Sequence, residues 1–332
     1  MTEETGYSRL IGHEDAVEKL VSAVKNNRVS HAWIFQGEPG SGRKMCAQLF
    51  AMALQCETQS GSPCMQCPSC RKALHGNHPD ILTVTPEKGG TLSVEDIRRQ
   101  LAADVSVRPY ESRYKIYIVP EADQMTVQAQ NAMLKTLEEP PAYCVILLLA
   151  EGTDAFLPTI SSRCISLTLR PVRTGLVRRY LEEQYGLDRE RAGLFAAFAR
   201  GSIGRAKALA EDEDYTDRMQ TCIEYLKHSR QADGAEQLAF VRKLAQDSAG
   251  IGFALELFSM WFRDVALMKA AEDAEQLIFA GEEQAIRTRA AKSSFEGLGR
   301  IFRALDSVQK RLKANVNTEL TLQVLLETVR EN

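Results

Sequence analysis

The chain has 332 residues, a formal net charge of −3 and a hydrophobic content of 44%. This length allows two or three domains with their own cores. The slightly acidic balance argues against a uniformly basic nucleic-acid-binding protein, so any DNA contact would need a local patch or a multi-subunit surface. No stretch approaches 18 uninterrupted apolar residues, so we expect no membrane span.

The sequence also indicates a cellular compartment. Its first residues lack the basic region and following apolar run of a secretory signal. Eight cysteines without such a signal are typical of a reducing compartment and argue against a disulfide framework. We therefore expect a cytoplasmic protein with no membrane partner.

The chain begins with a helix pattern over residues 10–28, followed by an apolar run over 30–37 that is typical of a buried parallel strand. The glycine-rich loop Gly37-Glu-Pro-Gly-Ser-Gly-Arg-Lys44 comes next, and an apolar helix pattern follows it. A strand, a glycine-rich loop and a helix in this order are the context that a phosphate-binding loop requires.

This loop departs from the phosphate-binding pattern G-x-x-x-x-G-K-[ST]. Gly37, Gly40 and Gly42 keep its glycine-rich character, but Arg43 stands at the lysine position and Lys44 at the hydroxyl position. Backbone N–H groups of the loop could still bind an anion. A lysine cannot supply the oxygen that magnesium needs. A merely structural glycine turn is the alternative.

A second departure lies after the apolar strand pattern at 116–119. In nucleotide hydrolases an aspartate here holds magnesium and a glutamate orients the attacking water. Glu121 could fill the second role, but Pro120 has no side-chain oxygen for the first. Because Lys44 and Pro120 each remove a magnesium ligand, we expect no productive binding of ATP and magnesium. An active ATPase that uses Arg43 and Lys44 for phosphate is the alternative.

Four cysteines between these two regions have the spacing C-x7-C-x2-C-x2-C; they are Cys56, Cys64, Cys67 and Cys70. Four thiolates close a tetrahedral site without an open position, which predicts a structural zinc ion. Unrelated reduced thiols and an iron–sulfur cluster are the alternatives, and His75 and His78 are near enough to compete as ligands. A zinc-containing nucleic-acid adaptor is a further possibility, although no Lys or Arg lies between the first and last cysteine.

Further strands are expected at 80–85, 114–119, 144–150 and 164–169, with a helix over 94–105 that Ser93 would cap. Another helix follows Glu121 and carries Ala129, Met133 and Leu137 on one face. This alternation predicts an α/β fold with a doubly wound, five-stranded parallel sheet. The loops at the carboxyl ends of the strands would bring the glycine-rich loop and Glu121 to one edge.

The chain is all-helical from Pro171 onward. Short helices are expected at 174–185 and 189–199, and an acidic run at 211–215 has the character of a linker. Two longer helices present apolar faces, which consist of Leu257, Trp261, Val265 and Met268 in one and Leu298, Ile301, Leu305, Val308 and Leu312 in the other. A last helix is expected at about 320–329.

Four stretches of the sequence resemble motifs of bacterial clamp-loader subunits of the AAA+ superfamily, and among these the delta-prime family of DNA polymerase III. They are Ser30-His-Ala with the strand and loop that follow, the four-cysteine insertion at 56–70, the run NAMLKTLEEPP at 131–141, and Ser161-Ser-Arg-Cys164. The resemblance implies an AAA+ nucleotide-binding-like domain over 1–170, a helical lid over 171–211 and a helical collar for oligomerisation over 212–332.

The resemblance also implies roles for two arginines. Arg163 would act in trans as an arginine finger, which stabilises charge on the phosphates at a neighbouring subunit's ATP site. A pair between Arg163 and a local carboxylate is the alternative. Arg205, in the lid motif Gly201-Ser-Ile-Gly-Arg205, would contact nucleotide in the same chain, or it is a relic of that role.

The function implied is that of a clamp-loader subunit that does not itself hydrolyse ATP. Its partners would be motor subunits of the gamma/tau type and a delta subunit in a hetero-oligomeric ring. Through that complex it would act on the sliding clamp and primed DNA. In the motor subunits, the alanine that corresponds to Ala150 is followed by a polar residue that senses phosphate. This chain has Glu151 at that position.

Overall fold

The structure is a computed structural model that describes residues 6–87, 89–245, 248–271, 276–314 and 316–332. The chain divides into two compact units. The first consists of Met1–Tyr180 and Ala199–Lys207, and the second of Leu181–Phe198 and Ala208–Asn332.

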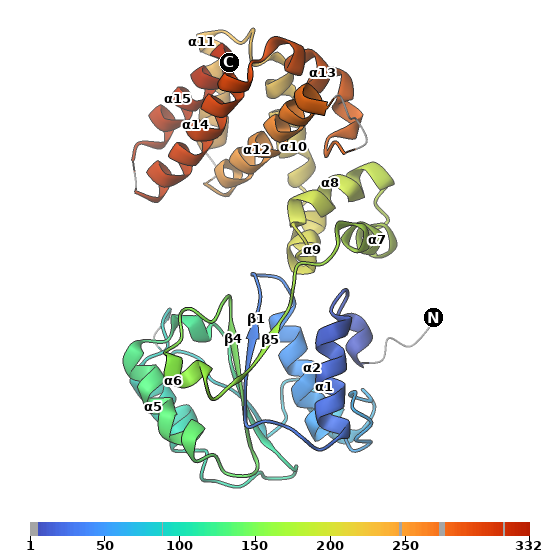
Figure 1. The fold of residues 1–332 in the computed structure, drawn as a ribbon, viewed down its shortest axis with the longest axis vertical. Helices are drawn as coiled ribbons and strands as arrows, with labels where there is room; N and C mark the ends of the chain where they lie inside the picture. The colour runs from blue at the N-terminus through green and yellow to red at the C-terminus, as the bar shows by residue number, and fades with distance from the viewer. Residues whose placement is uncertain (1–5, 88, 246–247, 272–275, 315) are drawn as a thin grey trace. The chain divides into compact units, whose positions relative to one another are not determined.

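The first unit is built on a five-stranded parallel sheet (Figure 1). Its strands, in spatial order, are β2 (Ile81–Thr83), β3 (Lys115–Val119), β4 (Cys144–Ala150), β1 (Ala32–Gln36) and β5 (Ile165–Thr168). Every residue of β3 and β4 is buried, as expected for parallel strands covered on both faces. The predicted doubly wound, five-stranded parallel sheet is therefore confirmed.

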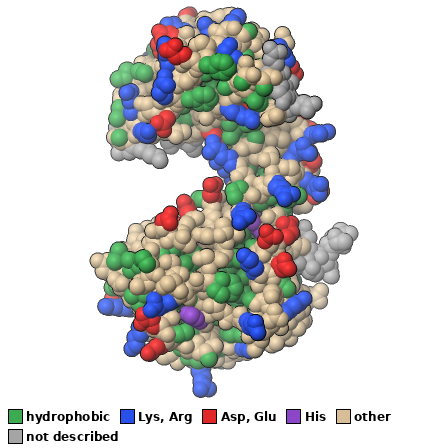
Figure 2. All heavy atoms as spheres, in the orientation of Figure 1, with side chains coloured by type: hydrophobic (Ala, Val, Ile, Leu, Met, Phe, Trp, Pro, Cys, Tyr) green, Lys and Arg blue, Asp and Glu red, His purple; other side chains and the backbone are tan. Residues whose placement is uncertain are grey.

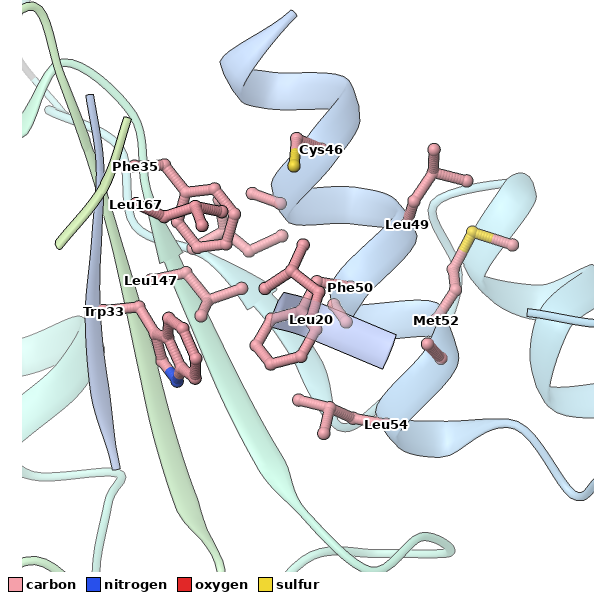
Figure 3. Close-up of a cluster of buried hydrophobic side chains, with 14 of the residues drawn as sticks. Leu20, Trp33, Phe35, Cys46, Leu49, Phe50, Met52, Leu54, Leu147 and Leu167 are labelled. Atoms are coloured by element: carbon pink, nitrogen blue, oxygen red, sulfur yellow. The ribbon is translucent and has the colours of Figure 1, made fainter. Parts of the chain in front are cut away.

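Helices cover both faces of the sheet (Figure 1). On one face lie α1 (Glu14–Lys25) and α2 (Arg43–Gln55). Figure 3 shows the buried cluster on this side, in which Leu20, Phe50 and Phe35 meet Leu147 and Leu167 of the neighbouring strands. Burying a large apolar side chain contributes about 1.5–3 kcal/mol, so this layer fixes the position of both helices.

The opposite face is covered by α5 (Val127–Glu138) and α6 (Pro158–Ser161) (Figure 1). The predicted apolar face of α5, which consists of Ala129, Met133 and Leu137, is buried against the sheet. The Thr126 hydroxyl caps the helix by accepting a hydrogen bond from the backbone N–H of Ala129 at 3.1 Å. The start of α5 is therefore fixed by its cap, and its apolar face is fixed by the sheet.

The helix predicted over 94–105 begins as expected and ends early. Ser93 and Asp96 form a capping box at the start of α4 (Val94–Ile97). The backbone then widens into the π-helical turn η2 (Arg98–Ala102). In this turn the Gln100 side chain hydrogen-bonds to the backbone N–H and carbonyl of Thr85, at 3.0 and 2.7 Å.

The remaining elements of the first unit are short; they are η1 (Gly6–Arg9), α3 (Pro68–Leu74) and η3 (Ala122–Gln124). Two longer helices, α7 (Thr174–Tyr185) and α9 (Ile203–Glu211), are each divided between the two units. The bounds of α7 match the prediction at both ends.

The second unit is all-helical, as predicted. Its elements are α8 (Arg189–Ala199), α10 (Tyr215–His228), α11 (Gly234–Ala245), α12 (Ser248–Ala271), η4 (Ala280–Glu282), α13 (Glu283–Lys292), α14 (Phe295–Lys313) and α15 (Thr318–Glu331). The predicted apolar face of α12 is buried, and so is that of α14 except for the partly exposed Leu312. Helices α10, α11 and α13 were not predicted from the sequence.

A buried carboxylate anchors the loop before β3 to the residue before β2. The Asp80 side chain is 1% exposed and accepts hydrogen bonds from the backbone N–H groups of Tyr110, Glu111 and Ser112, at 2.5, 2.9 and 2.9 Å. Hydrogen bonds to a charged group are about twice as strong as neutral ones. This contact therefore ties together two segments that lie 30 residues apart.

Replacement of Asp80 by alanine would leave three backbone donors without their acceptor. We expect the Asp80→Ala variant to lose about 3 kcal/mol in free energy of unfolding, measured by urea denaturation. Asp154→Ala, which removes an exposed aspartate of the same unit, serves as the control and should change the free energy by less than about 0.5 kcal/mol. Equal stability of the two variants would contradict the anchoring role.

Two buried histidines, His13 and His78, make the stability of the chain depend on pH. Burial lowers the pKa of both, although nearby acceptors and carboxylates oppose the shift. Below a pH of about 6.5 the unfolded chain therefore takes up protons that the folded chain does not. Their contribution to stability is complete above that pH and is lost as the pH falls below it.

Melting temperatures measured between pH 7.5 and 5.5 should therefore fall toward the acidic end. His13→Gln keeps an N–H donor but cannot be protonated, so its melting temperature should depend less steeply on pH. Equal pH slopes for the variant and the wild type would show that His13 does not contribute.

Candidate functional site

The glycine-rich loop follows β1 and leads into α2. Gly40 and Gly42 have φ angles of +75° and +93°, in the left-handed region that glycine adopts without strain. The Gly37 N–H donates to the carbonyl of Ala150, the last residue of β4, at 3.2 Å. The predicted strand–loop–helix unit is therefore present, with the loop at the carboxyl edge of the sheet.

His13, just before α1, holds this loop from one side. Its Nε2 lies 2.9 Å from the Ser41 carbonyl oxygen, and the ring is buried. A carbonyl can only accept, so Nε2 carries the proton. The loop is thereby tied to the start of α1.

The predicted lid motif holds the loop from the other side. The Ser202 hydroxyl donates to the Pro39 carbonyl at 3.1 Å, and the Gly204 N–H donates to the Gly40 carbonyl at 2.9 Å. A Cβ added at Gly204 would lie 2.8 Å from the Gly40 Cα, which leaves no room for a side chain. The Arg205 N–H donates to the Ser202 Oγ, so the first turn of α9 packs directly on the loop.

Pro120 and Glu121 follow β3, at the same carboxyl edge of the sheet. Glu121 has a φ angle of +49°, which a residue with a side chain adopts only at some cost in energy. Two residues on, the Asp123 Oδ2 accepts a hydrogen bond from the Glu151 N–H at 2.9 Å, just after β4. Neither Pro120 nor the exposed Lys44 offers a side-chain oxygen to a magnesium ion.

Arg163 lies between α6 and β5 with 35% of its side chain exposed. Its Nη2 pairs with the Glu138 Oε1 at 2.9 Å, and its Nη1 donates to the Thr159 carbonyl at 2.8 Å. The Ser162 Oγ lies 3.5 Å from Nη1. The guanidinium is thus paired with a local carboxylate in the free chain, and it remains at the surface.

The four predicted cysteine ligands come together where the loop after α2 runs into α3; Cys56, Cys64 and Cys67 belong to the loop, and Cys70 lies in the first turn of α3. Their Sγ atoms all lie within 4.8 Å of one another. The N–H groups of Cys64, Cys67 and Cys70 donate to the sulfur atoms of Cys56, Cys64 and Cys67, at 3.4, 3.3 and 3.4 Å. Four converging thiols supported by N–H donors fit a closed, tetrahedral zinc site.

The pKa values of two of these thiols are shifted in opposite directions. Burial raises the pKa of Cys64, but N–H donors and neighbouring thiols outweigh it and lower the pKa to about 6. Burial raises the pKa of Cys70 well above its ordinary value. Four thiolates this close repel one another, and a divalent metal ion would compensate their charge.

His75 and His78 do not belong to the ligand cluster found among the described residues. The His78 Nε2 lies 3.1 Å from the Ser69 Oγ, and its Nδ1 accepts a hydrogen bond from the Asp80 N–H at 3.1 Å. Both ring nitrogens are therefore engaged next to the cysteine loop.

Three residues that shape these sites were not singled out in the sequence: His13, Glu138 and Ser202. Glu138 and Ser202 lie inside recognised sequence motifs, but a motif does not show which side chains are in contact. Glu138 and Arg163 are separated by 25 positions, and no local pattern relates residues so far apart.

Comparisons with known proteins cover most of the chain. Residues 12–173 match the family described as DNA polymerase III, delta subunit, and residues 213–330 match DNA polymerase III, delta subunit, C terminal. A DNA polymerase III gamma subunit-related protein of Thermotoga maritima is a solved structure with 24% identity and a TM-score of 0.47; the match covers 96% of this chain and 99% of that one.

Curated relatives agree with the family matches. DNA polymerase III subunit tau of Escherichia coli is 31% identical over 211 residues, which are 62% of this chain and 32% of tau. The chain therefore spans about a third of that relative. DNA polymerase III subunit delta' of Bacillus subtilis is 28% identical over 320 residues, 94% of each chain. The chain belongs to the delta' subunit family of DNA polymerase III.

Proposed function

We propose that this chain is a delta' subunit that supports ATP hydrolysis in a clamp loader without performing it, and that it supplies Arg163 in trans to the ATP site of a neighbouring subunit. The observation that carries the proposal is a contrast within the first unit, between the magnesium positions and Arg163. The magnesium ligands are missing at Lys44 and Pro120, whereas Arg163 stays at the surface.

The residues at the magnesium positions support the absence of hydrolysis. Lys44 stands where a hydroxyl would bind magnesium, and Pro120 stands where an aspartate would bind it. Catalysis of phosphoryl transfer depends on positioned metal ions and charge-stabilising groups. This chain lacks a side-chain oxygen at both positions where a hydrolase binds magnesium.

The chemistry of the guanidinium supports the role of Arg163. A planar group with five N–H donors binds phosphate oxygens in a forked geometry. The contacts to Glu138, Thr159 and Ser162 engage at most three of these donors. At least two donors therefore remain for phosphate oxygens bound by a neighbouring subunit.

The partners follow from the family and its relatives. We propose gamma/tau-type motor subunits and a delta subunit in a hetero-oligomeric ring, with the sliding clamp and primed DNA reached through that complex in the cytoplasm. Blue and red side chains are interspersed over the visible face of each unit in Figure 2. On the face in view, basic side chains therefore do not form a continuous patch, which agrees with DNA contact through an assembly. Among the described residues, no helix is long and apolar enough to cross a membrane.

We further propose that the cysteine loop binds one structural zinc ion through Cys56, Cys64, Cys67 and Cys70. Zinc would supply cross-links for a loop with little apolar surface of its own. The four thiolates leave no coordination position for a substrate.

Arg163→Ala tests the role in trans. In a complex with a gamma/tau-type subunit, we expect ATP turnover at the receiving site to fall by about 10³-fold or more, because the developing phosphate charge loses its partner. Assembly, followed by size-exclusion chromatography, should be unchanged. Arg28→Ala, which removes an exposed arginine elsewhere in the same unit, is the control. Normal turnover by an intact Arg163→Ala complex would refute the assignment.

The same ATP-turnover assay on the purified chain alone tests the alternative that this chain is itself an active ATPase. We expect no magnesium-dependent turnover, and turnover that disappears in a Glu121→Gln variant would favour the alternative instead.

Metal analysis tests the zinc proposal. The purified chain should contain about one equivalent of zinc, and its removal by a chelator should lower the melting temperature because the loop loses its cross-links. Cys67→Ser should lose the metal, whereas Cys164→Ser, outside the cluster, should retain it. A chain purified without zinc that neither binds the added metal nor gains stability from it would rule the site out.

A further inference from the structure

Arg163 is held by two acceptors that belong to different helices. The Glu138 carboxylate, on the last residue of α5, pairs with Nη2 at 2.9 Å, and the Thr159 carbonyl of α6 accepts from Nη1 at 2.8 Å. The two terminal nitrogens are thus fixed separately. Two fixed acceptors set the orientation of the guanidinium plane. They also hold a side chain whose ordering costs about 2 kcal/mol of rotamer entropy.

The position of Glu138 is unfavourable for the helix that carries it. The C-terminal end of a helix bears partial negative charge, and a carboxylate there is destabilising. Glu138 ends α5, and Glu139 follows as the C-cap. The guanidinium of Arg163 compensates this negative charge. The ion pair with Arg163 therefore gives a reason for a carboxylate at a helix end that disfavours it.

The strength of the pair suits a group that must later bind a phosphate. The side chains of Arg163 and Glu138 are 35% and 50% exposed, and ion pairs at such sites contribute about 1 kcal/mol or less. This is enough to bias the rotamers of Arg163. It is too little to withhold the guanidinium from a polyanionic phosphate group, which makes stronger charge-assisted bonds.

We propose that Glu138 is a positioning residue, whose carboxylate holds the Arg163 guanidinium in the orientation in which it meets the phosphates bound by the neighbouring subunit. This inference rests on the proposed role of Arg163 in trans. Glu138 itself touches neither nucleotide nor the reacting atoms; it acts through Arg163.

The test uses the complex assembled with a gamma/tau-type subunit and measures kcat and KM for ATP. Glu138→Ala removes the acceptor, and we expect kcat to fall by about fivefold with KM unchanged. Glu138→Gln keeps an acceptor oxygen for Nη2 and should restore most of the rate. Glu139→Ala, which removes the exposed carboxylate next in sequence, should leave kcat at the wild-type level.

A double-mutant cycle separates positioning from a general loss of structure. In an Arg163→Ala background, Glu138→Ala should cause no further decrease, because the residue that it positions is gone. A fivefold decrease in both backgrounds would contradict the proposal, and so would a wild-type or increased kcat for Glu138→Ala alone. If Arg163→Ala itself leaves turnover unchanged, the role in trans fails first, and the positioning role fails with it.

Discussion

The parallel pairing of β4 with β3 and β1 is the constraint on which the first unit depends. All seven residues of β4 are buried, and its register places Ala150 beside Gln36 of β1 and Leu148 beside Val119 of β3. Parallel strands end at the same edge, so the loops after β1, β3 and β4 have to emerge together. The glycine-rich loop and Pro120 share an edge for that reason, whatever chemistry the edge retains.

The glycine-rich loop is tied to the start of α9 at this edge. The Pro39 carbonyl accepts a hydrogen bond from the Ser202 hydroxyl, and the Gly40 carbonyl accepts one from the Gly204 N–H. A Cβ at Gly204 would lie 2.8 Å from the Gly40 Cα, and a Cβ at Gly40 would lie even closer to the Ser202 Oγ, so neither position has room for a side chain. The start of α9 is accordingly part of the first unit, although the rest of that helix groups with the second.

The sequence predicted those features that local patterns determine. The buried runs of β1 and β4, the apolar face of α5 and the cysteine spacing all depend on residues close in sequence. Helix α13 was missed, and its buried Arg289 shows why. That guanidinium donates to the Val329 carbonyl at 2.5 Å and to the Ser229 Oγ at 3.2 Å, so a charged residue occupies a core position and breaks the apolar periodicity. Contacts such as His13 with Ser41 are tertiary and have no signature in the sequence.

An arginine that acts on a neighbouring subunit meets requirements opposite to those of a residue in its own chain's active site. It has to remain exposed, yet an exposed arginine is mobile, and an ordered one is more effective because its entropy is already lost. A weak ion pair at the surface reconciles these demands, since it orders the side chain without burying it. In the proposed role, Glu138 at the end of α5 and Arg163 in the turn between α6 and β5 have this arrangement. The Glu138 carboxylate then has a reason to stand at the end of α5, where the helix itself disfavours negative charge.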